Sequence, residues 1–584
     1  MTQPHVPATT PTHSDRIRRL GETRRQVLMR PPDQAVDVIL DYPEPAALVH
    51  SFPEEDLHFL IHDIGPVDAL PVIALASNRQ WDYLLDLETW NKDRLDYPQA
   101  TAWLQLLFQA DADRLVEWCF DERLEFLELY LFRNIEVHIR EPDQAPSDFG
   151  DGFFTDDDTF YVRLIDYPVA TPEEEAVKSR RNEILVRLLR HLSAFDHARY
   201  QGLLMESVGV IAGETEEELF RLRNVRLSEK GFLPFHEAIG VYQPLRPGDL
   251  AARGRKRLRP PAADGQPLPI PQFAATFLAG DNLFVRALKG IDDPHVIQQL
   301  QAELAGLCNQ IISADQKVIR VRDQLRQVVT RASSFLSIGL ELMTEGSAGS
   351  QEARASELLQ RHLLADIFRT GFASALALKW QATNWRQKSW YRTQQLDLTF
   401  WDEAWLGLLG GLLIDRPKFY DPSSSTSNYR DFHTYAEIAA TARALQQVMA
   451  IDGLFQQMGI VAASVKGTPP LTYQPVLLTL WARAWLKLPP PPAHAPSLAI
   501  PLSAFRDFYA ALWSDHGGRR IIGDDVRTAF LEWTVHTSGQ AAENLSDGLA
   551  DLFQDLFDEI ERELAPVRTG NLDPHHIHLF LLKP

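Results

Sequence analysis

The sequence predicts a mainly α-helical protein: an N-terminal α-solenoid of short helices, a small β-hairpin insertion and a C-terminal bundle of long helices. Between residues 31 and 110, short apolar segments are separated by prolines and capping residues. Between residues 294 and 335, apolar residues recur three and four positions apart, which is the helical period. The alternation typical of strands is brief and lies around residues 153–165.

Composition restricts the class of protein. The chain has 584 residues, 45% of them apolar and 23% charged, which indicates a folded soluble protein with more than one domain. Its formal charge of −21 argues against a nucleic-acid partner and against docking on anionic lipid. The sequence contains neither an apolar signal segment nor a run long enough to span a membrane, so we expect neither export nor a membrane span. Only Cys119 and Cys308 are present, which favours a cytoplasmic location.

The N-terminal third predicts a disordered tail followed by stacked helices. Residues 1–13 are rich in Pro and Thr and predict the tail. Residues 14–140 predict a superhelical domain, because each short helix has an apolar face too small to be buried alone. Within it, Ser51 to Glu54 has the spacing of a capping box, and Gly65 predicts the end of a helix. Residues 111–138 are more apolar and predict one longer helix.

The middle of the chain predicts linkers around a small folded insertion. Residues 141–245 comprise an acidic linker, a β-hairpin in "FFTDDDTFYVRLI" and further helices. Residues 246–272 form a basic, Pro-rich linker, where we place a domain boundary. Its basic tract, 254–261, is interpreted as a plain linker or a contact with the protein's own acidic helices. Binding to phosphate or to an acidic partner is the alternative.

Residues 273–584 predict a helical bundle built on one long helix, 294–335. Asp293 is suited to its N-cap and Pro294 to its first turn. The apolar period of this segment is that of a coiled-coil seam. We expect it to pair with a second helix, 355–382, as an antiparallel hairpin; a homodimeric coiled coil is the alternative.

Five polar residues of this predicted hairpin form a candidate ligand site. Asn309 and Asp315 lie on the flank of the seam, and three residues share one face of the second helix: His362, Asp366 and Arg369. Inside the bundle, these five groups would bind an anion, a divalent ion or a polar small molecule. The alternative is a polar network that fixes the register, with Arg369 paired to Asp366.

Other motifs give no catalytic or metal-binding assignment. The sequence lacks a Gly-rich phosphate loop, a G-x-S-x-G elbow and an H-E-x-x-H motif. His575, His576 and His578 cluster near the C-terminus, but the adjacent pair points apart, and the apolar residues that follow predict a terminal strand or docking tail. The aspartates between 148 and 158 lack the spacing of a calcium-binding loop. We therefore predict no metal and no cofactor.

Two resemblances add to these patterns. The segment "LVHSFPEEDLHFLIHDIGPVDALPVIAL" resembles part of the cytosolic superhelical domain of MgtE-type magnesium transporters, and the likeness covers residues 30–110. Over its full length, the chain resembles a delta-proteobacterial family of cytosolic proteins without an established function. The matching segments are "GFLPFHEAIGVYQPL", "SFLSIGLELM", "FRTGFASAL" and "GLLIDRPKFYDP". The full-length resemblance implies no activity, because none is established for that family. Transport is not implied either, because the transporter's membrane portion and nucleotide-binding modules have no counterpart here.

The leading functional hypothesis is a cytoplasmic scaffold or regulatory protein that binds another protein along a concave solenoid surface. The alternative is an enzyme, or a sensor of a small ligand or metal, with its polar site inside the C-terminal bundle. A homodimer is compatible with either hypothesis.

Overall fold

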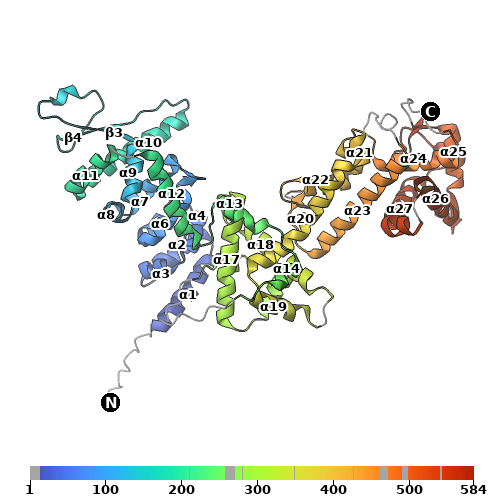
Figure 1. The fold of residues 1–584 in the computed structure, drawn as a ribbon, viewed down its shortest axis with the longest axis horizontal. Helices are drawn as coiled ribbons and strands as arrows, with labels where there is room; N and C mark the ends of the chain where they lie inside the picture. Colours follow the sequence, from blue (N-terminus) through green and yellow to red (C-terminus); the bar gives the residue numbers. More distant parts are fainter. Residues whose placement is uncertain are drawn as a thin grey trace, which may run out of the picture. The chain divides into compact units, whose positions relative to one another are not determined.

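The structure is a computed structural model that describes residues 13–208, 211–256, 270–278, 280–346, 349–424, 427–460, 471–489, 498–517, 519–539 and 542–583. Helices make up most of these residues, and the strands form only two-stranded sheets, so the predicted mainly α fold is confirmed (Figure 1). The predicted tail, apart from His13, and residues 257–269 of the predicted basic linker lie outside the described residues. None of the helices described is both long and apolar enough to cross a membrane.

The chain divides into two compact units. The first comprises residues 1–336 and 343–369, and the second residues 337–342 and 370–584. The division runs within two helices, α18 (Arg322–Thr344) and α20 (Leu364–Lys388). The boundary that the sequence predicts at 246–272 falls inside the first unit.

The first unit begins with a series of short helices, and several of them pack against the helix two positions further along the chain. Prolines in the first turn of four of these helices separate them from their predecessors. The helices are α1 (His13–Met29), α2 (Pro32–Leu40), α3 (Pro45–Ser51), α4 (Glu54–Ile64), α5 (Leu70–Leu75), α6 (Asn78–Glu88), α7 (Tyr97–Ala110), α8 (Ala112–Glu122) and α9 (Leu124–Phe132).

Local capping differs in part from the prediction. Gly65 ends α4 with a φ of 103°, as predicted. The predicted capping box at Ser51 is wrong, because Ser51 is the last residue of α3 and its hydroxyl donates to the Leu48 carbonyl. A capping box instead begins α6, where Ser77 and Gln80 exchange hydrogen bonds.

The predicted helix 111–138 is also wrong, because the chain forms α8, α9 and a strand there. Arg123, between the two helices, is buried and its guanidinium pairs with Asp82 and Asp86. The strand β3 (Ile135–Ile139) then pairs antiparallel with β4 (Phe160–Leu164). Strand β4 lies in the predicted hairpin, but its partner is β3, and Phe154 forms only an isolated bridge to Val162. The alternating β-branched residues of β3 outweigh the apolar helical pattern that precedes them.

The rest of the first unit contains the small hairpin of β1 (Trp90–Asn91) and β2 (Arg94–Leu95) and a second set of helices. These are η1 (Pro146–Asp148), α10 (Pro172–Phe195), α11 (His197–Val208), α12 (Ala212–Ser228), α13 (Phe235–Ala238), η2 (Ile239–Tyr242), α14 (Pro247–Ala252), α15 (Phe273–Thr276), α16 (Leu283–Lys289), α17 (Pro294–Asp315), α18 and α19 (Gln351–Arg361). Helix α17 packs against η2, α13 and α15, and α16 packs against α19.

The predicted long helix 294–335 is wrong. Asp293 caps α17 as predicted, but the helix ends at Asp315, and Gln316 adopts a left-handed conformation with a φ of 50°. The Lys317 amide donates back to the Ile312 carbonyl at 3.2 Å, which closes the helix in the manner of a Schellman cap. Val318 and Val321, assigned to the seam, are 57% and 53% exposed.

The partner segment 355–382 is interrupted as well. Helix α19 ends at Arg361 and α20 begins at Leu364, with His362 in an extended conformation between them. The predicted hairpin of two uninterrupted helices therefore does not form.

In the second unit, the rest of α20 is followed by α21 (Trp390–Thr393), η3 (Leu398–Trp401), α22 (Asp402–Leu413), β5 (Phe419–Tyr420), β6 (Tyr429–Arg430), α23 (Tyr435–Gln457), α24 (Tyr473–Trp485), β7 (Ile500–Pro501), α25 (Leu502–Ala511), β8 (Trp513–His516), β9 (Arg519–Ile522), α26 (Asp524–Ser538), α27 (Ala542–Leu564), η5 (Thr569–Asn571) and β10 (Leu582–Lys583). Its core contains many aromatic side chains, among them Trp401 and Trp481. Of the terminal strand or docking tail predicted after the C-terminal histidines, a strand forms at Leu582–Lys583 only, where β10 pairs in parallel with β7.

Candidate metal centre

Two histidines on α4 face one carboxylate on α6. His58 and His62 are four residues apart, so they lie on the same side of α4. Leu57 and Ile61 of the same helix are buried and fix its rotation. Helix α6 packs against α4 and supplies Glu88 as its last residue. The histidine pair therefore depends on local helix geometry, whereas the carboxylate is brought in by packing.

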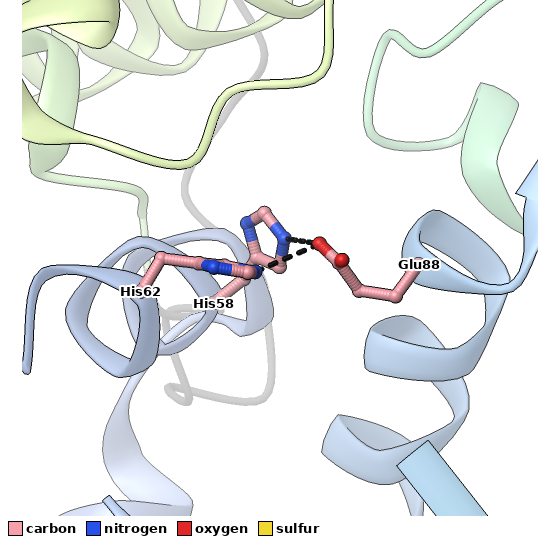
Figure 2. A group of neighbouring side chains, drawn as sticks. All are labelled: His58, His62 and Glu88. Carbon is pink, nitrogen blue, oxygen red and sulfur yellow. Dashed lines mark hydrogen bonds and ion pairs between the residues drawn. The ribbon is translucent and has the colours of Figure 1, made fainter. Parts of the chain in front are cut away.

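The three side chains converge closely (Figure 2). The Nε2 atoms of His58 and His62 lie 2.7 and 2.8 Å from Oε1 of Glu88. One potential ligand atom from each residue lies within 4.8 Å of the other two. All three side chains are at most 8% exposed. They thus form a compact, buried polar cluster between the two helices.

The electrostatics of the cluster suit metal coordination. Burial alone raises the pKa of Glu88, but the hydrogen bonds from the two imidazoles outweigh it and hold this pKa well below its usual range. Burial lowers the pKa of His58, against the opposing effect of Glu88. An ionised carboxylate and a neutral imidazole are the forms that bind a divalent metal ion.

The two N–O distances are also close to the ligand spacing of a metal site. Metal–ligand bonds of about 2.1 Å at angles between about 90° and 109° place neighbouring ligand atoms about 3.0 to 3.4 Å apart. The two N–O distances of 2.7 and 2.8 Å are slightly shorter, as expected where a proton rather than a metal lies between the atoms. Opening each of these two N–O contacts by a few tenths of an ångström would bring them into that range.

A pocket adjoins the cluster. His58 and Glu88 line a space of about 660 Å³ together with the β1–β2 hairpin, α12, α13 and residues 312–320. His62 lines a separate, smaller apolar cavity with Phe59 and Phe277. A metal held by three protein ligands keeps positions for water or a further ligand, and this pocket has room for one.

Comparison with known proteins places the chain in a family. The sequence profile described as "Family of unknown function (DUF6178)" matches residues 13–583. The chain belongs to this family. No curated protein and no solved structure matches it. Membership of the DUF6178 family supplies no activity, and the resemblance to the MgtE-type transporter domain stays a prediction.

Of the five residues predicted as a ligand site in this DUF6178 chain, Asn309 and Asp315 lie on α17. Asn309 is buried on α17 and donates to the Lys230 carbonyl at 2.7 Å. Asp315 accepts from the Tyr242 hydroxyl at 2.7 Å and pairs with Arg331.

The other three residues surround the break between α19 and α20. His362 is buried, and burial lowers its pKa. Asp366 and Arg369 contact each other at 3.3 Å, as the register-network interpretation expects. Asp366 also accepts from Arg253 at 2.7 Å, and Arg369 donates to the Gln243 carbonyl at 2.9 Å. A joint ligand site of the five residues stays a prediction.

A local sequence pattern relates two of the three cluster residues, His58 and His62, but not Glu88. The segment "HFLIH" (58–62) places two histidines at the i, i+4 spacing of helical metal ligands, but it lacks the glutamate that the H-E-x-x-H motif requires. Glu88 follows His62 after 25 intervening residues, and no local pattern marks it. Only the packing of α4 against α6 brings it to the histidines.

Proposed function

We propose that this protein binds a divalent transition-metal ion through His58, His62 and Glu88, and that the bound metal acts on a ligand in the adjoining pocket. The observation that carries the proposal is the convergence of two imidazoles and one ionised carboxylate within 4.8 Å, at the wall of a pocket. Two histidines and one carboxylate with open positions favour a metal that binds or activates a further ligand. The corresponding class is a metal-dependent enzyme or a metal-responsive ligand sensor.

This proposal keeps the enzyme-or-sensor alternative from the sequence but moves the site to α4 and α6. The competing hypothesis is a hydrogen-bonded contact that only fastens α4 to α6. The two hypotheses differ in their response to metal, because an ion that binds the folded state alone stabilises it by mass action. A merely structural triad gains no stability from metal.

The test uses the full-length protein after chelator treatment and dialysis. Zn²⁺, Mn²⁺, Ni²⁺ or anaerobic Fe²⁺ is added, and bound metal is measured by mass spectrometry of the elements alongside thermal unfolding. We expect one equivalent of at least one ion and a rise in Tm. Glu88→Gln, which keeps the size of the side chain and one acceptor, should abolish both effects.

The C-terminal histidines provide the matched control. His575 and His576 are exposed, with side-chain exposures of 79% and 84%, and are the obvious adventitious ligands. The double variant His575→Gln, His576→Gln should retain the full metal content. Equal metal binding by wild type and Glu88→Gln, or its loss in the double variant, would refute the proposed centre.

The protein-binding scaffold, the homodimer and the cytoplasmic location stay predictions from the sequence. Light scattering of the purified protein tests the dimer directly. A partner that co-purifies equally with wild type and Glu88→Gln would support a scaffold role independent of the metal centre.

A further inference from the structure

A basic side chain lines the pocket without an acidic partner of its own. Arg223 on α12 donates through Nε to the Asp86 carbonyl at 2.5 Å and through Nη1 to the Asn224 side chain at 3.1 Å. Within the described ranges, no carboxylate forms an ion pair with it. The Asp86 carboxylate, which acts on Arg223 electrostatically, is itself bound to Arg226 at 2.7 Å.

Neighbouring arginines of α12 show the contrast. Arg221 pairs with Glu218 one turn away, and Arg226 pairs with Asp86. Arg223 lies between them in sequence but lines the pocket that Glu88 also lines. Its neutral partners leave guanidinium donors for a ligand.

Two aromatic rings hold the guanidinium in place. The Arg223 guanidinium carbon lies 5.8 Å from the ring centroids of both Trp90 and Phe220, and those rings contact each other at 5.5 Å. Burial lowers the pKa of Arg223 to about 10, so the group stays charged at neutral pH. A cation fixed in this way loses little side-chain entropy when it binds an anion.

The remaining charged groups of the pocket wall also favour an anion. Lys92, Lys317 and Arg320 line it, besides Arg223, and of these Lys317 lies 3.9 Å from the Asp315 carboxylate. The acidic side chains there are Glu88, Asp93 and Asp96. Glu88 is bound to the two histidines, and Asp96 accepts from the Gln99 amide in the first turn of α7. Much of the acidic charge therefore already has protein partners.

We propose that the ligand of this pocket is a small organic oxyanion whose carboxylate or phosphate group binds Arg223 while another of its oxygen atoms binds the metal. The inference rests on the proposed metal centre and names the class of ligand that the centre would act on. A guanidinium group binds both kinds of oxyanion through two parallel hydrogen bonds. Arg223 is a specificity residue here, and it is not a metal ligand.

The test measures anion binding by calorimetry with two probes, succinate and inorganic phosphate, on metal-free and metal-loaded full-length protein. We expect at least one probe to bind the metal-loaded wild type, and to bind it more tightly than the metal-free form. Arg223→Gln should weaken that binding by about tenfold or more, with unchanged metal content. Arg223→Lys keeps the charge but not the two parallel donors of a guanidinium group. It should bind the probe less tightly than wild type and more tightly than Arg223→Gln.

Arg221→Gln on the same helix is the control and should bind like wild type, since Arg221 is exposed and faces Glu218. Circular dichroism and Tm show whether each variant is folded, and Arg223→Lys keeps the test valid if Arg223→Gln is not. The inference is overturned if metal-loaded wild type binds neither probe, or if the folded Arg223 variants bind as tightly as wild type. Failure of the metal centre would appear differently, as a wild type that takes up no metal.

Discussion

Each of the two units contains a buried carboxylate with several hydrogen-bond donors, and the donors differ in kind. In the second unit, Asp452 on α23 accepts from the backbone amides of Trp390 and Tyr391 at 2.9 and 3.0 Å and from Nε1 of Trp385 at 3.2 Å. In the first unit, Glu88 accepts from two imidazoles. Amide and indole N–H groups cannot bind a metal, whereas imidazoles can exchange a proton for one. The same carboxylate chemistry therefore gives a permanent anchor in one unit and, at the proposed metal centre, an exchangeable site in the other.

The pKa shifts follow this difference. Burial raises the pKa of Asp452, although three N–H donors oppose it. Burial also acts to raise the pKa of Glu88, but its two histidines reverse the shift. The group with titratable partners is thus the one held firmly in the charged form that a metal requires.

The largest expected effect is the loss of the anchor. Asp452→Ala would leave three buried N–H groups without an acceptor, which should lower the free energy of unfolding of the second unit by about 3 kcal/mol or more. Asp452→Asn keeps one acceptor oxygen and should cost less. Urea unfolding followed by tryptophan fluorescence measures both. If Asp452→Ala unfolds like wild type, the anchor interpretation is incorrect.

A second variant tests whether the backbone contact at Gly231, next to the pocket-lining Phe232, is as rigid as the anchor. Gly231 has a φ of 85°, and a Cβ atom there would lie 2.8 Å from Cα and the carbonyl oxygen of Gly306 on α17. Gly231→Ala should therefore destabilise the first unit by about 2 kcal/mol, through both strain and clash. The measurement is thermal unfolding of the metal-free protein.

Gly240→Ala is the control for that variant, because a Cβ atom at Gly240 meets nothing within 4 Å. It should change the Tm little. Equal effects of the two substitutions would show that the contact between the chain at 231 and α17 is looser than the structure indicates.

A third comparison tests whether added metal stabilises the protein through Glu88, at the proposed metal centre, and not through Asp452, the anchor. In metal-free protein, Glu88→Gln replaces charge-assisted hydrogen bonds by neutral ones and should cost about 1 to 2 kcal/mol. Its decisive effect is the loss of stabilisation by added metal. Asp452→Asn should keep that stabilisation in full. Differential scanning calorimetry with and without metal compares the two, and an equal response to metal in both would remove the distinction between the units.

What could be predicted from the sequence depended on local signals. The helical class, the cap at Asp293 and the end of α4 at Gly65 follow from residue types acting on their own neighbourhood. The prediction of one long helix is wrong at Gln316. Glutamine seldom adopts the left-handed conformation, and no other residue type in the sequence marks the break. The stop is made by the Schellman-type bonds that the chain forms after Ile312.

The candidate metal centre and its pocket likewise combine residues related by a local sequence pattern with residues that only packing brings together. His58 and His62 share a helix face, which the sequence alone specifies, but neither was predicted as a ligand because the segment between them lacks the glutamate of an H-E-x-x-H motif. Glu88 and Arg223 reach the pocket through the packing of α6 and α12, and contacts between residues far apart in sequence leave no local pattern. The prediction of Asp366 beside Arg369 needed only the spacing of three residues.

The smallest expected effect concerns a third carboxyl, which faces a second acid. Glu128 on α9 is half-buried and shares a hydrogen bond with Glu206 on α11, and burial together with this second acid raises the pKa of Glu128 to about 7 from an ordinary value of 4.5. Between these values the folded state binds more protons than the unfolded state. The free energy of unfolding should therefore fall as the pH rises from about 4.5 to 7, by less than about 1 kcal/mol because the pair is partly exposed to solvent.

Glu206→Gln removes the neighbouring charge while keeping a hydrogen-bond partner, so it should flatten this slope and stabilise the protein slightly at neutral pH. Glu217→Gln, at an exposed position of α12, is the matched loss of one acid and should leave the slope unchanged. Urea unfolding at several pH values separates the two variants, and a slope that persists in Glu206→Gln would assign it to other groups. A reduced slope would complete the comparison: a carboxyl facing fixed donors is an anchor, one facing imidazoles is open to metal, and one facing another acid retains its proton.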